Sequence, residues 1–431
     1  MHHAVRTVVA AVALALPAAV LADASPSAQA NAAVMAQAQA NRQPLLDTLK
    51  QLVEIESGSG DREGLDRISQ LAYDKLKALG GDVQFIEPGD DAYRMEDTPK
   101  QIGRMVKAEW HGTGKAKILM IAHMDTVYKR GMLARQPFRI EGDKALGLGI
   151  ADDKQGVALV IHTVAALQAM NFKDYGTLTV LFNGDEEISS PGARNMITKE
   201  GAAHDLTMSF EGSRVNADKL SLATSGIGGV IIKVKGKASH SGSAPERGIN
   251  ALVELSNQIL QTKDLSDPKT GLKMNWTMSS AGNGSHNVIP EHAEAFADVR
   301  VSTVDDYDRI EKEVREKITH KIVPNAQVEM VFERRRPPLQ TWEASTKVAA
   351  HAKDIYREVG RDLIVDAKAE GGGTDAAFAA LKTKNAVIER FGLQGFGAHS
   401  TEDEYILISS IEPRLYLSTR LIMDVSQGKA L

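Results

Sequence analysis

The sequence contains no cysteine, and this absence excludes several kinds of chemistry. Disulfide frameworks, thiol nucleophiles and thiolate metal sites are all ruled out. Any metal ion must therefore be held by histidine, aspartate and glutamate. The sequence also has no large excess of positive or negative charge. Its 51 Lys and Arg nearly balance its 56 Asp and Glu, and the formal net charge is −5. No basic stripe dominates any region, so we expect no nucleic-acid partner.

Long apolar runs are missing too, apart from one at the N-terminus. Arg6 precedes an uncharged run that ends at Ala22. This pattern is typical of a secretory signal peptide, and the run is shorter than the about 20 residues that span a bilayer. We expect a signal peptide over residues 1–22 and a soft leader over residues 23–44. The mature protein is then expected to be periplasmic or secreted, with no membrane association.

From Leu45 onward, short apolar runs alternate with stretches of helical periodicity. This alternation predicts an α/β fold with a mostly parallel sheet covered by helices on both faces. The predicted strands and helices, in chain order, are helix 61–79, strand 118–122, helix 156–170, strand 178–182, helix 193–200, strand 205–210 and helix 344–359.

The middle of the chain has a different order of elements, βαββαβ, which is the split-βαβ or ferredoxin-like arrangement. Its predicted elements are strand 229–234, helix 250–262, strands 273–278 and 293–301, helix 305–319 and strand 327–332. The 431 residues are enough for two to three domains. We therefore predict one domain in two parts, 45–223 and 337–431, interrupted by an inserted domain over 224–336.

Polar clusters follow the predicted strands of the main domain. His123 and Asp125 come directly after a strand and project to the same side, so Asp125 can hold one imidazole nitrogen while the other binds a metal. A buried histidine satisfied by a nearby aspartate is the alternative. Asp152 follows the glycines 147 and 149, which permit a tight backbone that aims it into a site. Helix capping is the alternative for Asp152.

A run of three acids, Asp185-Glu186-Glu187, follows the next strand. Adjacent acids repel unless a cation or a proton lies among them. One acid as metal ligand and another as general base is a natural division of roles, and a solvated acidic loop is the alternative. Glu211 ends a further strand, and His399 lies in a glycine-rich loop late in the chain.

Together these places supply histidine and carboxylate ligands at the ends of strands in one open sheet, where ligand sites of such sheets lie. Nitrogen and oxygen ligands without sulfur suit Zn²⁺, Co²⁺ or Mn²⁺. Five ligands exceed a tetrahedral zinc site. They suit two metal ions that share a bridging carboxylate, with a water molecule between them.

Six motifs in this order resemble those of the dizinc exopeptidases and deacylases that include acetylornithine deacetylase and succinyl-diaminopimelate desuccinylase. The chain looks most like the bacterial glutamate carboxypeptidases (glucarpidase, or carboxypeptidase G type), and the resemblance covers about residues 45–424. The motifs are His123-Met-Asp-Thr-Val, Gly147-x-Gly-x-x-Asp152-Asp-Lys, Asp185-Glu-Glu187, Ser209-Phe-Glu211, Gly236-Lys-Ala-Ser-His240 and Gly371-Gly-Gly-Thr-Asp375.

The resemblance implies a hydrolase that removes C-terminal glutamate from folates, from analogues such as methotrexate, or from related N-acyl-glutamates. It implies two Zn²⁺ ions per subunit with Asp152 as the bridging ligand, Glu186 as general base and Asp125 orienting His123. The full implied ligand set is His123, Asp152, Glu187, Glu211 and His399. Gln155, Gly212 and Ala398 depart from the residues common in the family, but none of them removes a ligand.

The inserted domain resembles the family's lid and dimerisation domain, which implies a homodimer. His240 resembles a group that reaches the neighbouring subunit's site to hold the oxyanion; judged from the residues alone, an exposed loop histidine is favoured. The candidate substrate-binding residues, two of them glycine-loop residues that can offer backbone N–H groups, are Arg300, Asn287, Arg336, Lys219, Gly372 and Thr374. The cluster 334–336 fits a solvated basic edge equally well.

Two other functions remain open. A deacylase for another N-acyl amino acid or a dipeptide would use the same metals with a different pocket. A non-catalytic periplasmic binding protein would be expected to have lost the general base, yet Glu186 is present. Among the histidines that fall in no motif, four are interpreted as structural: His162, His204, His286 and His351.

Overall fold

The computed structural model describes residues 29–400 and 402–431, so the predicted signal peptide lies outside the described part. Helix α1 spans Ala32–Val53, and the side chain of Asn31 caps its first turn. Val34 and Ala38 are buried in the main core. Residues 32–44 therefore belong to the folded body, and the prediction of a soft leader is wrong for them. An alanine-rich stretch has high helix propensity, and few apolar side chains are enough to dock it.

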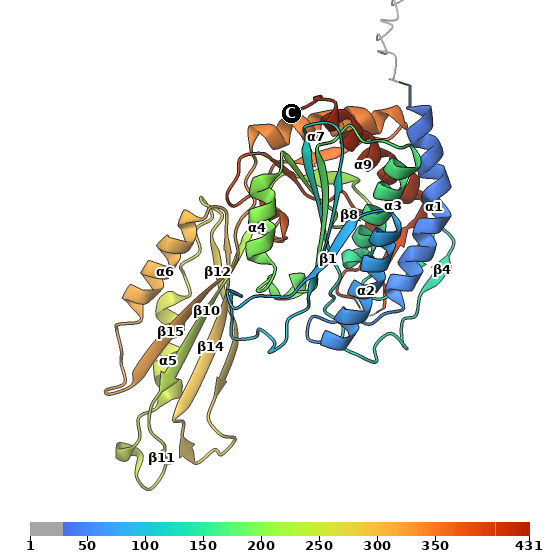
Figure 1. The fold of residues 1–431 in the computed structure, drawn as a ribbon. Coiled ribbons are helices and arrows are strands. Elements are labelled where there is room, and N and C mark those ends of the chain that lie inside the picture. The colour runs from blue at the N-terminus through green and yellow to red at the C-terminus, as the bar shows by residue number, and fades with distance from the viewer. Residues whose placement is uncertain (1–28, 401) are drawn as a thin grey trace, which may run out of the picture.

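The main sheet has six strands in the order β1-β2-β6-β3-β7-β17 (Figure 1). The strands β6, β3, β7 and β17 are parallel, whereas β1 and β2 form an antiparallel edge. This confirms the mostly parallel sheet, although the edge pair was not predicted. The bounds are β1 Asp82–Ile86, β2 Met105–His111, β3 Lys117–His123, β6 Thr177–Asn183, β7 Leu206–Ser209 and β17 Ala386–Ile388.

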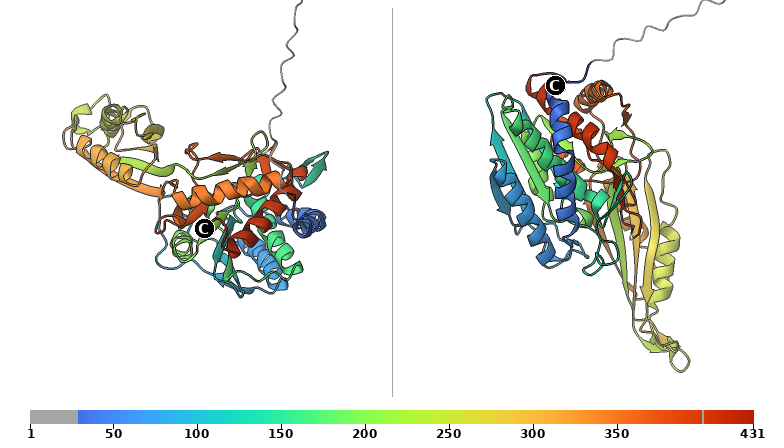
Figure 2. Two further views of the ribbon diagram at one scale, coloured as in Figure 1. Left: turned by 90° about the horizontal axis from the view of Figure 1, so that it is seen from above. Right: turned by 90° about the vertical axis from the view of Figure 1, so that its right-hand side faces the viewer.

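Helices cover both faces of this sheet (Figure 2). In β3, Ile118 and Met120 face the larger core, which the long helices cover, while Leu119 and Ile121 face a smaller core under α4 and α8. A strand buried on both faces explains why its sequence is a continuous apolar run. The helices are α2 Arg62–Ala78, α3 Gln155–Ala169, α4 Arg194–Ala203, α7 Glu343–Glu358, α8 Ala376–Ala379 and α9 Ile411–Ser426.

The inserted domain forms a second, antiparallel sheet in the order β12-β14-β10-β15, which confirms the βαββαβ arrangement. It has its own apolar core between this sheet and two helices and projects from the main body (Figure 1). We call it the lid. Its elements are β10 Gly226–Lys235, α5 Ala251–Thr262, β12 Lys273–Ala281, β14 His292–Val301, α6 Asp305–Lys317 and β15 Gln327–Arg336. At its far tip, β11 (Ser239–His240) pairs with β13 (Val288–Ile289).

A small five-stranded sheet in the order β4-β5-β19-β18-β8 was not predicted from the sequence. It joins segments that are far apart in the chain and thereby brings the loops after β5, β7 and β18 together. Its strands are β4 Arg139–Glu141, β5 Lys144–Leu146, β8 Ser213–Arg214, β18 Gln394–Phe396 and β19 Tyr405–Leu407. Beside it, β9 (Lys219–Ser221) pairs in parallel with β16 (Ile364–Asp366). Among the described residues, we find no helix with the length and apolar character that crossing a membrane requires.

Candidate metal centre

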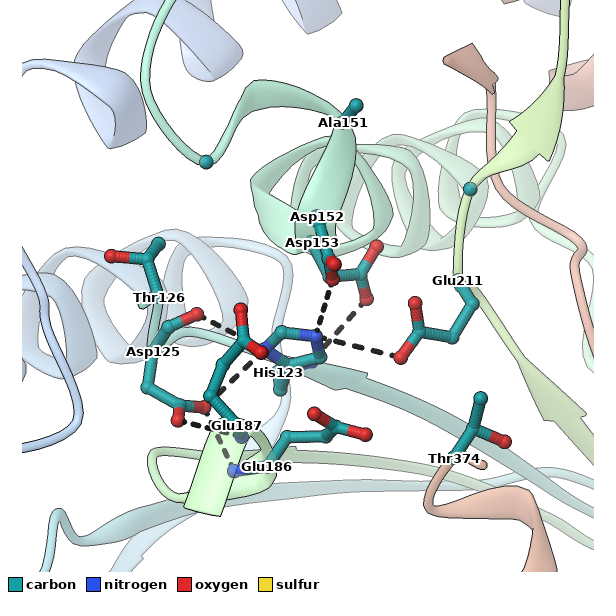
Figure 3. A network of polar contacts seen from close by, with 12 residues as sticks. His123, Asp125, Thr126, Ala151, Asp152, Asp153, Glu186, Glu187, Glu211 and Thr374 are labelled. Carbon is teal, nitrogen blue, oxygen red and sulfur yellow. Dashed lines mark hydrogen bonds and ion pairs between the residues drawn. The ribbon is translucent and has the colours of Figure 1, made fainter. Parts of the chain in front are cut away.

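Two histidines contact the two oxygens of one carboxylate at the carboxyl end of the main sheet. His123, the last residue of β3, places Nε2 3.0 Å from Asp152 Oδ1 (Figure 3). His399 places Nε2 3.3 Å from Asp152 Oδ2. Asp152 therefore lies between two imidazoles that are far apart in the sequence. This is the arrangement expected of a carboxylate that bridges two metal ions.

Each imidazole also meets a second carboxylate. Glu211 Oε1 lies 3.4 Å from His123 Nε2, and Glu187 Oε2 lies 3.1 Å from His399 Nε2. Ligand atoms within 4.8 Å of one another form two sets, Asp152 with Glu187 and His399, and His123 with Glu211 and Asp153. Asp153 is less suited as a ligand than Asp152, because its Oδ1 already accepts a hydrogen bond from Gln155 Nε2 at 2.6 Å.

Asp125 is fully buried and holds two parts of the cluster in place. Its Oδ1 lies 3.3 Å from His123 Nδ1, and its backbone oxygen lies 3.0 Å from the same nitrogen. Its carboxylate also accepts hydrogen bonds from the backbone N–H groups of Glu186 and Glu187, at 2.9 and 3.1 Å, and from Ser59 Oγ at 2.7 Å. The structure therefore brings Asp125 next to His123, as the sequence predicted.

The cluster has more buried carboxylates than cations. Burial raises the pKa of Glu187 to about 7, with the charge of Asp152 acting in the same direction. Burial alone would lower the pKa of His123, but hydrogen bonds to Asp125, Asp152 and Glu211 raise it well above its usual range. Within the described residues, Glu187 Oε1 is buried without a hydrogen-bond partner. Two divalent cations would neutralise this charge and satisfy that oxygen, so the residues present fit a two-metal site.

Glu186 lies beside the cluster and pairs with Arg336. Burial raises the pKa of Glu186 well above its usual range, although the charge of Arg336 opposes this. The Arg336 guanidinium donates to Glu186 Oε1 at 2.5 Å, to the Glu186 backbone oxygen at 2.6 Å and to Asp375 Oδ1 at 3.2 Å. Arg336 is only 3% exposed. Its contacts therefore assign it to Glu186 rather than leaving it free for a substrate carboxylate.

Sequence reasoning missed Glu404, which ties three loops of the site together. This fully buried carboxylate accepts hydrogen bonds from the backbone N–H groups of Gly149, Ala151 and Asp152, at 2.8, 2.9 and 3.2 Å. Tyr128 Oη donates to Glu404 Oε2 at 2.5 Å. The loops after β3 and β5 are thus fixed to the segment that follows His399. An acid five residues beyond a candidate ligand is the signal that was available in the sequence.

Gln155 was noted as a departure from the family, and the structure gives it a role. It is fully buried and its amide nitrogen also donates to the Phe210 backbone oxygen at 2.9 Å, while its oxygen accepts from Leu393 N at 2.5 Å. It therefore links the Asp152 loop to the strand end that carries Glu211. This contact explains how a larger residue is accommodated at this position.

A cavity of about 510 Å³ opens beside the cluster, and Gly372 and Thr374 are among its lining residues. The other predicted substrate-binding residues lie elsewhere. Arg300 donates to the Gly371 backbone oxygen at 3.0 Å, and Lys219 Nζ is paired with Asp366 at 2.7 Å.

Asn287 and His240 are both exposed at the far tip of the lid, where Ser241 N donates to the Asn287 backbone oxygen. Neither residue lines the cavity within this chain. The structure thus brings together the predicted metal ligands and general base but leaves the predicted lid residues away from them.

The histidines outside the motifs have other surroundings. His162 is buried and contacts Thr48 Oγ1 and Asn41 Oδ1, both at 2.9 Å. His204 bonds to Thr179 Oγ1, and His351 bonds to Asp424, both at 2.8 Å. His286 is exposed in the lid hairpin.

Comparison with known proteins agrees with this geometry. The sequence profile of peptidase family M20/M25/M40 matches residues 119–424. The chain belongs to this peptidase family.

Among its relatives, carboxypeptidase G2 of Pseudomonas sp. (strain RS-16) is 44% identical over 92% of this chain and 93% of its own length. A succinyl-diaminopimelate desuccinylase of Gluconobacter oxydans (strain 621H) is 26% identical over 71% of this chain and 81% of its own. An M20 family metallo-carboxypeptidase from Sulfolobus solfataricus has the same fold, with a TM-score of 0.72 at 16% identity, covering 88% of this chain and 98% of its own. The chain is a member of a metallopeptidase family, and its candidate metal ligands lie together beside the carboxyl end of the main sheet.

Proposed function

We propose that this protein is a zinc-dependent glutamate carboxypeptidase that hydrolyses the amide bond between an acyl group and a C-terminal glutamate. Folates, analogues such as methotrexate and related N-acyl-glutamates are the substrate class. The observation that carries the proposal is Asp152, whose two carboxylate oxygens face the Nε2 atoms of His123 and His399. The 44% sequence identity to carboxypeptidase G2, over most of both chains, supports the same reaction.

In this proposal His123, Asp152, Glu187, Glu211 and His399 hold two Zn²⁺ ions. Such ions polarise the scissile carbonyl and lower the pKa of the attacking water. Cobalt and manganese accept the same ligands.

Glu186 then takes the proton from the attacking water and delivers it to the leaving amide nitrogen. Its position next to the ligand cluster without facing either imidazole suits this role. Arg336 and Asp375 keep its carboxylate in one orientation, since Arg336 donates to both the side chain and the backbone of Glu186. Asp125 holds the same loop in place, because its carboxylate accepts hydrogen bonds from the backbone N–H groups of Glu186 and Glu187.

A homodimer completes the site in this proposal. His240 and Asn287 lie too far along the lid to serve their own subunit, so they would act at the site of a second copy. Two features of the lid suit pairing: β12 is an edge strand, and α5 exposes Leu252, Val253 and Leu260. Unpaired strand edges and exposed apolar helix faces are surfaces that oligomers cover. The segment 1–22 supports export to the periplasm or the medium.

Release of glutamate from folate or methotrexate by the purified mature protein tests the proposed reaction. We expect release to stop on chelation and to return when zinc is added back. If two metal ions bind per chain but no glutamate is released, the chain hydrolyses a different N-acyl amino acid, as the desuccinylase relatives would suggest. Absence of metal binding would refute the two-metal site itself.

A further inference from the structure

The cavity beside the metal cluster is also lined by two arginines that the proposed mechanism does not use. Arg214 belongs to β8, and Arg390 follows β17. Lys219, on the neighbouring strand β9, is 3% exposed. All three cations come from the main domain, whereas the substrate-binding candidates Arg300 and Asn287 come from the lid.

A carboxylate of the same chain, that of Glu370, contacts two of these three cations. Glu370 Oε1 lies 2.6 Å from Lys219 Nζ, and Glu370 Oε2 lies 3.3 Å from Arg214 Nη2. The hydrogen bond from Lys219, together with the charges of Arg214 and Arg390, lowers the pKa of Glu370. The Glu370 side chain is 44% exposed, so solvent competes for these contacts and the carboxylate is held weakly.

The charges in this region do not balance. Lys219 is also paired with Asp366, and Arg214 pairs with Glu370. In the described part of the chain, Arg390 forms no ion pair, and one of its guanidinium N–H groups donates to the Gly212 backbone oxygen at 2.7 Å. Three cations thus meet two carboxylates here, and two of these cations, Arg214 and Arg390, line a cavity that opens to solvent.

The glycine loop that follows Glu370 separates two cationic positions. On one side, Arg300 of the lid donates to the Gly371 backbone oxygen. On the other side, Glu370 reaches the cations of the main domain. Gly371 has a φ of +98°, a left-handed conformation that glycine adopts without strain, and no described residue crowds the place that a Cβ would occupy.

We propose that Arg214 and Arg390 form a subsite for a carboxylate on the acyl part of the substrate, and that Glu370, which Lys219 also holds, occupies this subsite when no substrate is bound. The inference rests on the proposed hydrolysis of N-acyl-glutamates. Guanidinium groups bind carboxylates through paired N–H donors, and a bound carboxylate replaces Glu370 one for one. A neutral acyl group would displace Glu370 without forming an ion pair in its place, and so gains no binding free energy. The enzyme therefore prefers N-acyl-glutamates with a carboxylated acyl group.

The test compares two probes of the same shape, N-(4-carboxybenzoyl)-glutamate and N-(4-carbamoylbenzoyl)-glutamate. We expect the zinc-loaded wild type to hydrolyse the carboxylated probe with a kcat/KM about tenfold higher, as expected for a charged hydrogen bond at a partly exposed site. In the Arg214→Ser/Arg390→Ser variant this ratio should fall to about one. Glu370→Gln should raise the ratio, because the competing carboxylate is removed. Arg357→Ser is the control, since Arg357 pairs with Asp354 on the exposed side of α7.

Equal kcat/KM for both probes in the wild type, or an unchanged ratio in the double variant, would overturn the subsite. Glu370→Gln changes one exposed side chain and so keeps the test valid if the double variant does not fold. Hydrolysis of neither probe would refute the proposed reaction instead. Calorimetric binding of both probes to the zinc-loaded Glu186→Gln variant then decides about the subsite: tighter binding of the carboxylated probe that the two serines abolish supports it, and equal binding refutes it.

Discussion

The metal cluster and the tip of the lid both contain histidines in the motifs of one family, but they differ in how the chain holds them. His123 is 2% exposed, and carboxylates of Asp125, Asp152 and Glu211 surround its ring. His240 is exposed, and its Nδ1 accepts hydrogen bonds from the backbone of its own hairpin, at Gly242 and Ser243. One chain therefore organises the metal cluster completely. In the proposed homodimer, the lid histidine acts at the site of the other subunit.

The largest expected effect separates catalysis from metal binding within the cluster. Glu186→Gln should lower turnover by about 10²- to 10⁴-fold, because the proton acceptor is lost. Both metal ions should remain, since the proposed ligand set does not include Glu186. Glutamate release and elemental analysis of the purified variant measure the two quantities. Glu343→Gln, at an exposed position on α7, is the control, and retained turnover in Glu186→Gln would contradict the general-base role.

The next effect tests the lid. His240→Ala should lower turnover by about 10²-fold, the size expected when one donor to an oxyanion is lost, with metal content and dimerisation unchanged. His286→Ala, in the same exposed hairpin region, should have no effect.

Mixed dimers sharpen this comparison. Subunits carrying Glu186→Gln and His240→Ala, mixed in equal amounts, should recover about a quarter of the wild-type activity, because half of the dimers then contain one complete site. No recovery in dimers that exchange subunits would show that His240 does not act across the interface.

A smaller effect concerns the support of the cluster. Glu404→Gln should weaken metal binding by about 10- to 100-fold, since an amide cannot accept the hydrogen bonds from Tyr128 and from three backbone N–H groups as a carboxylate does. Competition with a metal-binding dye measures this affinity. Glu402→Gln, two residues earlier and exposed, is the matched control. If both variants bind metal equally well, Glu404 has no positioning role.

The smallest effect contrasts a structural histidine with those of the cluster. Burial lowers the pKa of His162 from 6.5 to about 4 in the folded protein. Its neutral form therefore stabilises the fold fully above pH 6.5, and this contribution is lost as the pH falls toward 4. At pH 5.5 the loss should be about 1.4 kcal/mol. Urea unfolding of the wild type and of His162→Gln should show a stability difference that shrinks by this amount between pH 7.5 and 5.5. A pH-independent difference would contradict the prediction.

Most of the secondary structure could be predicted because its signals are local. The buried run at 118–122 became β3, and the βαββαβ order of the lid was correct. The antiparallel strands β1 and β2 were missed, and α1 begins at Ala32 rather than near Leu45. Strands of two to four residues, such as β8 and β18, carry no periodic signal. Their pairing depends on contacts between distant segments, and the small sheet that positions the site was therefore not predicted.

The candidate site, too, could be predicted from the sequence only in part. Residue types and their places after strands were enough to select the ligand candidates, because the carboxyl ends of parallel strands meet at one edge. Sequence alone did not show that Arg336 pairs with Glu186, or that Glu404 holds the Asp152 loop. Both contacts join residues more than a hundred positions apart.

The sequence by itself determined the absence of sulfur ligands, the α/β architecture with an inserted domain and the set of histidines and acids available for two metal ions. Only the tertiary structure decided which oxygen of Asp152 faces which imidazole, which cations line the cavity and that His240 lies outside it. Residue type and local spacing limit the possible chemistry. Distances between groups depend instead on how β3, β5, β7 and β18 pair, and a short stretch of sequence does not encode that pairing.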